Sequence, residues 1–238
     1  MRILALDTAT ENCSAALFIN GSCLERERLL GRGAAEVILP MVEALLSEAQ
    51  VGLRDLDALA FGRGPGGFTG VRLAASVTQG LAFGADLGVV GVSDLRALAQ
   101  RAMGEDPHCQ RVLACTDARM HEVYCGAFER SAAGVALAAA EERVVAPQRV
   151  CLPQAWSLGP RPLGVGSGFA AYPELAATLA GQLADIRNNL WPRAREIAQL
   201  AAAEVAAGRL DPPERALPVY LRDDVTQPAR PQPRGSSI

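Results

Sequence analysis

Short apolar segments alternate with amphipathic segments along most of the chain, which is typical of an α/β protein. Residues 2–7 form a short apolar run that ends in an aspartate, and Asn20-Gly21 separates two further strand-like runs, 13–20 and 22–30. Asn-Gly is a strong hairpin signal because both residues tolerate a positive φ. The pattern therefore predicts that the chain opens with three strands, at least two of them antiparallel.

Helical periodicity replaces this pattern between residues 34 and 50. The apolar side chains there cover about 160° of the helical circumference, whereas one core-facing surface needs a stripe of roughly 100°. The surplus predicts a second buried contact, and a partner chain could provide it. The predicted contact residues are Ile38, Val42, Leu45 and Leu46.

A second helix is expected to begin at Gly70, with Thr69 as its cap. Small residues recur at every fourth position of this helix, so another backbone could approach it closely. These residues are Ser76, Gly80 and Gly84. Because glycine within a helix costs roughly 1 kcal/mol relative to alanine, Gly80 indicates a packing requirement. We expect this helix, including Arg72, to complete the partner interface.

The glycine-rich loop before this helix is the most specific motif in the sequence. It consists of Gly64, Pro65, Gly66, Gly67, Phe68, Thr69 and Gly70. Its backbone N–H groups could bind an anion, but such glycines equally serve a rigid turn and close packing. The chain has no lysine, which excludes a Walker A loop, and we favour the structural role.

Two aspartates follow apolar strands and could line a nucleotide cleft. Asp7, with Thr8 beside it, ends the first strand, and Asp117 follows a strand in the second half. A carboxylate beside hydroxyls could hold a phosphate or a hydrated metal, or could simply cap its turn. The repeated arrangement suggests a duplicated fold. However, Arg119 and Met120 follow Asp117, where a phosphate-binding turn favours glycine, so these candidates assign no cofactor.

Composition restricts the chemistry further. A net charge of −3 provides no basic surplus for a dominant nucleic-acid surface. All 23 basic residues are arginine, and His108 and His121 are the only histidines. We therefore expect neither a metal site nor a catalytic constellation. Free thiols, no signal core and no apolar run of about 18 residues predict a cytoplasmic protein.

The length of 238 residues allows two lobes. The polar stretch 104–110 predicts the boundary, which gives an N-terminal lobe of residues 1–105 and a C-terminal lobe of residues 106–225. The last helix of the second half could pack on either lobe. Residues 226–238 are rich in proline and polar groups and are expected to be a disordered tail.

Several segments resemble, in chain order, the bacterial TsaB (YeaZ) family. They include ILALDTATENCSAALF, LAFGRGPGGFTGVRLA, DARMHEVYCGAF and PVYLRDDV. The resemblance covers residues 1 to about 225. It implies an actin-like ATPase, sugar kinase and Hsp70 (ASKHA, ribonuclease H-like) fold, with two lobes of mixed sheets flanked by helices. The second lobe would be a degenerate copy of the first.

The resemblance also implies a role in forming threonylcarbamoyladenosine at position 37 of tRNAs that read codons beginning with A. In this family the paralogue TsaD is the catalytic transferase, TsaB is a scaffold that dimerises with it, and the ATPase TsaE is the third member. The expected protein is thus not an enzyme and has no cofactor. It would form a homodimer when alone, contact tRNA only through the complex, and bind no membrane.

Two alternatives belong to other functional classes. A glycoprotease-like peptidase needs a metal pair or an activated nucleophile. The first helix reads Ala34-Ala35-Glu36-Val37, without the H-x-x-x-H pair of TsaD relatives. A nucleotide-dependent carbohydrate kinase needs a phosphate-binding turn in each half, and the residues after Asp117 argue against one.

Overall fold

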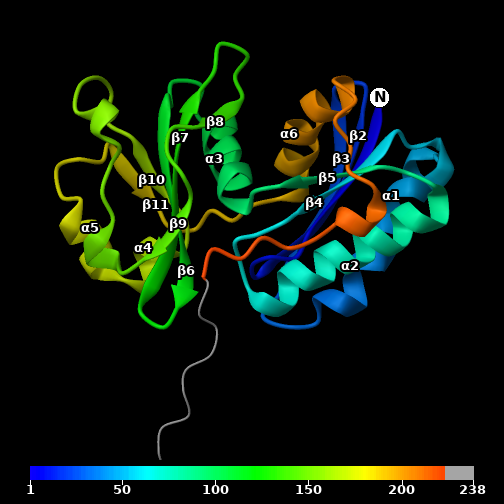
Figure 1. Cartoon of the computed structure of the whole chain (residues 1–238), viewed down its shortest axis with the longest axis horizontal. Helices are drawn as coiled ribbons and strands as arrows, with labels where there is room; N and C mark the ends of the chain where they lie inside the picture. The colour runs from blue at the N-terminus through cyan, green and yellow to red at the C-terminus, as the bar shows by residue number, and fades with distance from the viewer. Residues whose placement is uncertain (223–238) are drawn as a thin grey trace, which may run out of the picture.

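The computed structural model describes residues 1–222, and the predicted tail, 226–238, lies outside the described residues. Two lobes lie side by side, and each is built on a mixed β-sheet (Figure 1). This arrangement confirms the predicted fold class. Among residues 1–222, no helix has the length and apolarity needed to cross a membrane.

The first sheet has the strand order β3-β2-β1-β4-β5. Its strands are β1 (Arg2–Asp7), β2 (Asn12–Ile19), β3 (Ser22–Leu29), β4 (Ala58–Gly62) and β5 (Val89–Val92). Strands β1, β2 and β3 pair antiparallel, whereas β1, β4 and β5 pair in parallel. Asn20 and Gly21 join β2 to β3 with positive φ angles of 49° and 95°, which confirms the predicted hairpin.

The second sheet repeats this arrangement in the order β8-β7-β6-β10-β11. Its strands are β6 (Arg111–Arg119), β7 (Glu122–Arg130), β8 (Ala136–Ala138), β9 (Arg143–Val145), β10 (Leu163–Val165) and β11 (Asp185–Arg187). Strands β6, β7 and β8 pair antiparallel, β6, β10 and β11 pair in parallel, and β9 adds to β7. The common order and direction confirm the expected duplication.

Helices cover both sheets. They are α1 (Ala34–Ala49), α2 (Phe68–Ala85), α3 (Asp94–Glu105), α4 (Gly168–Ala171), α5 (Pro173–Thr178) and α6 (Ala194–Ala206), with short 3-10 turns at Leu53–Asp55, Pro147–Arg149, Gln154–Trp156 and Pro213–Arg215. Helices α1 and α2 pack on one face of the first sheet and α6 on the other. On the second sheet, α4 and α5 lie opposite α3.

Two helices cross between the halves of the chain (Figure 1). Helix α3 belongs to the first half in sequence, yet it packs on β6, β7 and β8, where Leu98 and Met103 join the core around Phe128. Helix α6 belongs to the second half and packs on β1, β2, β4 and β5. The packing therefore divides the chain differently from a single boundary at residue 105.

The predicted exposure of the α1 contact residues is wrong for three of the four. Ile38, Val42 and Leu45 are 0%, 4% and 0% exposed and lie in the core of the first lobe. The reason is that α1 packs against the sheet and α2 within the same chain, so the lobe itself covers most of the apolar arc. Leu46 is half-buried, and Leu39 is a large apolar residue of this helix that is exposed.

Helix α2 begins at Phe68, two residues before the predicted start, and Gly67 is its N-cap. Thr69 therefore lies in the first turn and is not the cap, contrary to the prediction. The helical hydrogen bonds already begin where the Val71 N–H donates to the Gly67 carbonyl at 3.0 Å. The N–H of Gly67 itself donates to the Ala9 carbonyl at 2.7 Å, which fixes the start of the helix beside the β1–β2 turn.

Candidate functional site

The glycine-rich loop packs directly on the turn between β1 and β2. A Cβ atom at Gly66 would lie 2.6 Å from the Ala9 carbonyl oxygen, and one at Gly70 would lie 1.9 Å from the Thr8 carbonyl oxygen. Gly64 has a φ of 101° and precedes a cis peptide bond to Pro65. These glycines are required for close backbone approach, and this geometry favours the structural role of the loop.

Asp7 and Thr8 form hydrogen bonds within the first lobe. Asp7 is 0% exposed, and its Oδ1 accepts a hydrogen bond from the Ala9 N–H at 2.8 Å. Thr8 is 3% exposed, and its hydroxyl donates to the Gly70 carbonyl at 2.6 Å. The folded chain thus engages Asp7 Oδ1 and the Thr8 hydroxyl, which favours the turn-capping alternative over the cofactor role.

Asp117 caps its own turn in the second lobe. It lies within β6, which extends two residues beyond it and ends at the left-handed residues Arg119, Met120 and His121. The Asp117 Oδ1 accepts hydrogen bonds from the Arg119 N–H and the Tyr172 hydroxyl, both at 2.8 Å. Its Oδ2 lies 2.9 Å from the Arg119 guanidinium. This geometry supports the turn-capping alternative over the cofactor role.

A cleft of about 660 Å³ lies between the lobes. The loop 65–70 lines one side and Thr116, Asp117 and Ser167 line the other. The cleft therefore occupies the place where the duplicated sheets face each other.

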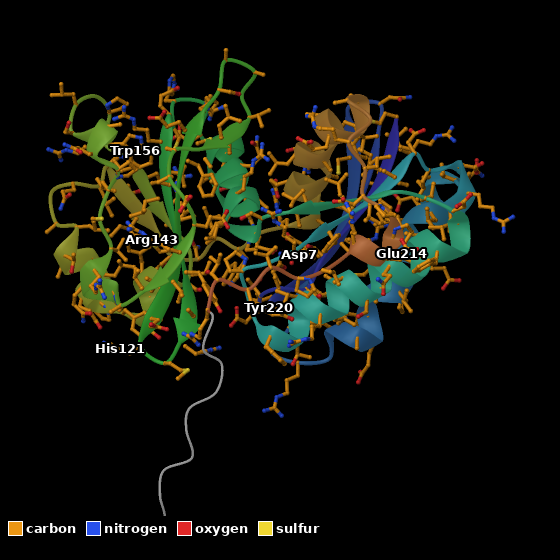
Figure 2. The ribbon with its side chains drawn as sticks, in the orientation of Figure 1. Asp7, His121, Arg143, Trp156, Glu214 and Tyr220 are labelled. Carbon is orange, nitrogen blue, oxygen red and sulfur yellow. The ribbon has the colours of Figure 1, made fainter. Side chains whose placement is uncertain are left out.

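The C-terminal segment 217–222 links the two lobes across this cleft, a feature that the sequence analysis missed. On the first lobe, the Val219 N–H donates to the Arg63 carbonyl at 2.7 Å. On the second lobe, Arg222 donates to Glu122 and, at 3.3 Å, to the Ala118 carbonyl. In Figure 2, Tyr220 lies close to the junction of the lobes. In the sequence this segment belongs to the family-like stretch PVYLRDDV, but it lacks the helical or strand periodicity that would place it in the fold.

The tip of α2 carries a stack of three side chains. The guanidinium carbon of Arg72 lies 3.1 Å from the centroid of the Phe68 ring and 5.0 Å from that of Tyr220. The two aromatic rings are 6.2 Å apart. Arg72, predicted as an interface residue, thus also holds segment 217–222 against α2.

The two histidines lie at opposite ends of β6, a strand of nine residues that spans about 30 Å. His121, at the far end of the second lobe in Figure 2, contacts Glu174 at 2.9 Å. The pair therefore cannot bind one metal ion together. Burial raises the pKa of the thiols of Cys13 and Cys23 to about 11, so these thiols stay protonated at neutral pH. This geometry gives no support to the peptidase alternative.

The outer face of α1 and α2 carries an apolar groove. A shallow groove of about 570 Å³ runs between the helices, and its apolar lining is Leu39, Val42, Leu46, Val51 and Leu81. Beside it, Ser76, Gly80 and Gly84 are exposed. A Cβ atom at Gly80 or Gly84 would meet no atom of the described chain within 4 Å. The glycines of this stripe therefore have no packing role within the chain.

Two mixed sheets of the same strand order, each flanked by helices, define a duplicated α/β fold. A family model described as "TsaD: tRNA N6-adenosine threonylcarbamoyltransferase" matches residues 28–229. The tRNA threonylcarbamoyladenosine biosynthesis protein TsaB of Escherichia coli is 40% identical over 94% of this chain and 96% of its own length. That of Haemophilus influenzae is 38% identical over 95% of both chains. The structure of YeaZ from Pseudomonas aeruginosa matches with a TM-score of 0.85 and 43% identity, covering 92% of this chain and 99% of that one. The chain belongs to the TsaB family.

Proposed function

We propose that this chain is a non-catalytic subunit that binds the transferase TsaD during formation of threonylcarbamoyladenosine at position 37 of tRNAs that read codons beginning with A. Its relatives are named as biosynthesis proteins of this modification. The family model that spans most of the chain describes the transferase itself. Two proteins of one fold can pair through equivalent surfaces, as identical subunits do in a two-fold dimer.

The observation that carries the proposal is the open glycine stripe on α2. A glycine inside a helix costs stability, and a Cβ atom at Gly80 or Gly84 would meet no atom of residues 1–222 within 4 Å, so close packing among these residues does not require glycine there. Small residues allow a partner helix to approach closely, and the adjacent apolar groove supplies area to bury. Arg72, Ser76 and Gly80, with Leu46 of the groove and the exposed Leu39, form the proposed TsaD face. In the absence of TsaD, a second copy of the chain would cover it.

The cleft supports a non-catalytic role for the chain itself. Asp7, Thr8 and Asp117 are engaged with other groups of the same chain, as described above. Catalysis would then reside in TsaD, with TsaE as the third member, and tRNA would be contacted through the complex. The proposed location is the cytoplasm, where tRNA is modified.

A reconstituted assay tests this proposal. Threonylcarbamoyladenosine in tRNA is measured after incubation with TsaD, TsaE and a threonylcarbamoyl donor, with and without this chain, and ATP turnover is measured for the chain alone. The proposal expects modification to require the chain, and the chain alone to hydrolyse no ATP. It is wrong if TsaD and TsaE modify tRNA equally well without the chain. It is also wrong if the purified chain turns over ATP and Asp117→Asn abolishes that turnover.

A further inference from the structure

A pair of buried carboxyl groups joins the two lobes. Asp7 is the last residue of β1 in the first sheet, and Asp94 is the first residue of α3, the helix that packs on the second sheet. They are 0% and 2% exposed. Both side chains lie against Gly62 of β4, and each carboxyl group shifts the pKa of the other. The contact therefore lies where the chain passes from one lobe to the other.

One oxygen of each carboxyl group is occupied by the backbone. The Ala9 N–H donates to Asp7 Oδ1 at 2.8 Å, and the Gly64 N–H donates to Asp94 Oδ2 at 2.5 Å. The other two oxygens, Asp7 Oδ2 and Asp94 Oδ1, are buried and have no hydrogen-bond partner among the described residues. Two ionised carboxylates in this position would repel, whereas a proton on one of them makes it a hydrogen-bond donor to the other.

Both carboxyl groups lie against the backbone of β4. A Cβ atom at Gly62 would lie 2.4 Å from Asp94 Oδ1 and 3.0 Å from Asp7 Oδ1, so the backbone of β4 covers the two groups. A hydrogen bond between the two carboxyl groups needs only a proton.

The surrounding charges favour retention of that proton. The negative charge of Glu196 in α6 raises the pKa of Asp7, and that of Glu142 in the β8–β9 connection raises the pKa of Asp94. Arg193 donates two hydrogen bonds to Glu196. On β2, the titratable group beside Asp7 is the thiol of Cys13. The positive charges of Arg63 and Arg96 favour the ionised form of Glu142. Burial raises the pKa of Asp7 to about 6, and burial together with the charge of Asp7 raises the pKa of Asp94 well above its ordinary value.

We propose that Asp7 and Asp94 hold one proton between them at neutral pH, and that this proton latches β1 to α3 and thereby fastens the two lobes. Loss of the proton leaves two facing anions. Their repulsion separates the end of β1 from the start of α3 and loosens residues 62–67, which Asp94 holds through the Gly64 N–H. The latch is independent of the TsaD face, which lies on the outer side of α1 and α2.

The sign of the pH dependence follows from linkage. In the unfolded chain both groups release their protons near the ordinary aspartate pKa of 3.8, whereas the folded chain retains a proton to higher pH. The folded state then binds more protons than the unfolded state, so stability falls as the pH rises from about 4 through the folded pKa values. When the folded state holds one more proton than the unfolded state, the unfolding equilibrium constant increases by up to about tenfold for each unit by which the pH rises.

Asp94→Asn tests the latch, with Asp94→Ala as the matched control. Asparagine keeps the shape, an oxygen that accepts from the Gly64 N–H, and an N–H that donates to Asp7 without a proton to lose. We expect Asp94→Asn to be at least as stable as the wild type at pH 8 and to show a weaker loss of stability between pH 5 and 8 in urea denaturation. Asp94→Ala should be less stable at every pH. Equal destabilisation by both substitutions, or an unchanged pH slope in Asp94→Asn, would overturn the proposal.

The wild-type protein provides a second measurement that needs no variant. Carboxyl ¹³C NMR should show that one of the two aspartates keeps its proton above pH 6. Hydrogen exchange of the Gly64 amide, corrected for its intrinsic pH dependence, should accelerate when that proton leaves. If both carboxyl groups titrate near pH 4, or if the Gly64 amide stays equally protected after the proton leaves, the latch does not exist.

Discussion

The carbonyl oxygen of Thr8 and the Cα of Gly70 are in direct contact, and a Cβ atom at position 70 would lie only 1.9 Å from that oxygen. The Thr8 hydroxyl adds a hydrogen bond to the Gly70 carbonyl at 2.6 Å. The contact ties the end of β1 to the start of α2. It explains why the loop needs glycine at this position even though the φ of Gly70 is not positive.

Gly70→Ala should therefore destabilise the protein by more than about 2 kcal/mol, because β1 and α2 must separate to admit the methyl group. Gly80→Ala is the matched control in the same helix. Its Cβ would meet open space, so replacing a helical glycine should stabilise the isolated protein by up to about 1 kcal/mol. Urea denaturation of both variants measures the difference. Similar stabilities for the two would contradict the close contact.

Val42→Glu should prevent stable folding, because it buries an unpaired charge in the first lobe. Leu39→Glu, one turn away and 49% exposed, should leave the melting temperature close to that of the wild type. Thermal unfolding of the two variants, followed by circular dichroism, tests whether Val42 is buried and Leu39 exposed. A folded Val42→Glu variant would restore the original interface prediction for this residue.

Arg222→Ala should destabilise the protein by about 1 kcal/mol, since it removes charge-assisted hydrogen bonds from segment 217–222 to the second lobe. Arg209→Ala, which breaks the more exposed ion pair with Glu204, should cause no measurable change. The free energy of unfolding of each variant is the readout. Equal effects would show that segment 217–222 does not link the lobes.

Alkylation should reach Cys151 first, because its side chain is exposed. Cys13 is buried, and burial raises the pKa of its thiol to about 11, so at pH 8 it is both covered and protonated. Timed treatment of the folded protein with iodoacetamide, followed by peptide mass spectrometry, gives the order of reaction. Labelling of Cys13 as fast as Cys151 would contradict the burial of β2.

Local signals predicted the hairpin at Asn20-Gly21 and the duplicated sheets correctly, because turn chemistry and strand periodicity depend on neighbouring residues. They failed for α1, where the width of the apolar arc cannot show which neighbour covers it. Ile38 is buried by its own lobe, although the same arc would suit a partner chain.

The sequence could not show the surroundings of Asp7 for a related reason. A strand-ending aspartate looks the same in sequence whether it faces a cleft or a second carboxyl group, and Asp94 gave no signal because its partner is 87 positions away. The crossing of α3 to the second sheet was equally invisible, since a helix that follows a first-lobe strand is assigned to that lobe by default. In contrast, Gly80 carried its own signal, a glycine within a helix, and the structure leaves it exposed.

The binding of TsaD to Gly80→Leu, compared with Gly104→Leu, tests the central claim most directly. Both glycines lie in helices and would place a Cβ in open space, but Gly104 lies on α3, away from the proposed face. Titration calorimetry with purified TsaD should show wild-type affinity for Gly104→Leu and a loss of about 100-fold or more for Gly80→Leu, both folded by circular dichroism. A folded Gly80→Leu variant that binds TsaD as tightly as the wild type would contradict the account.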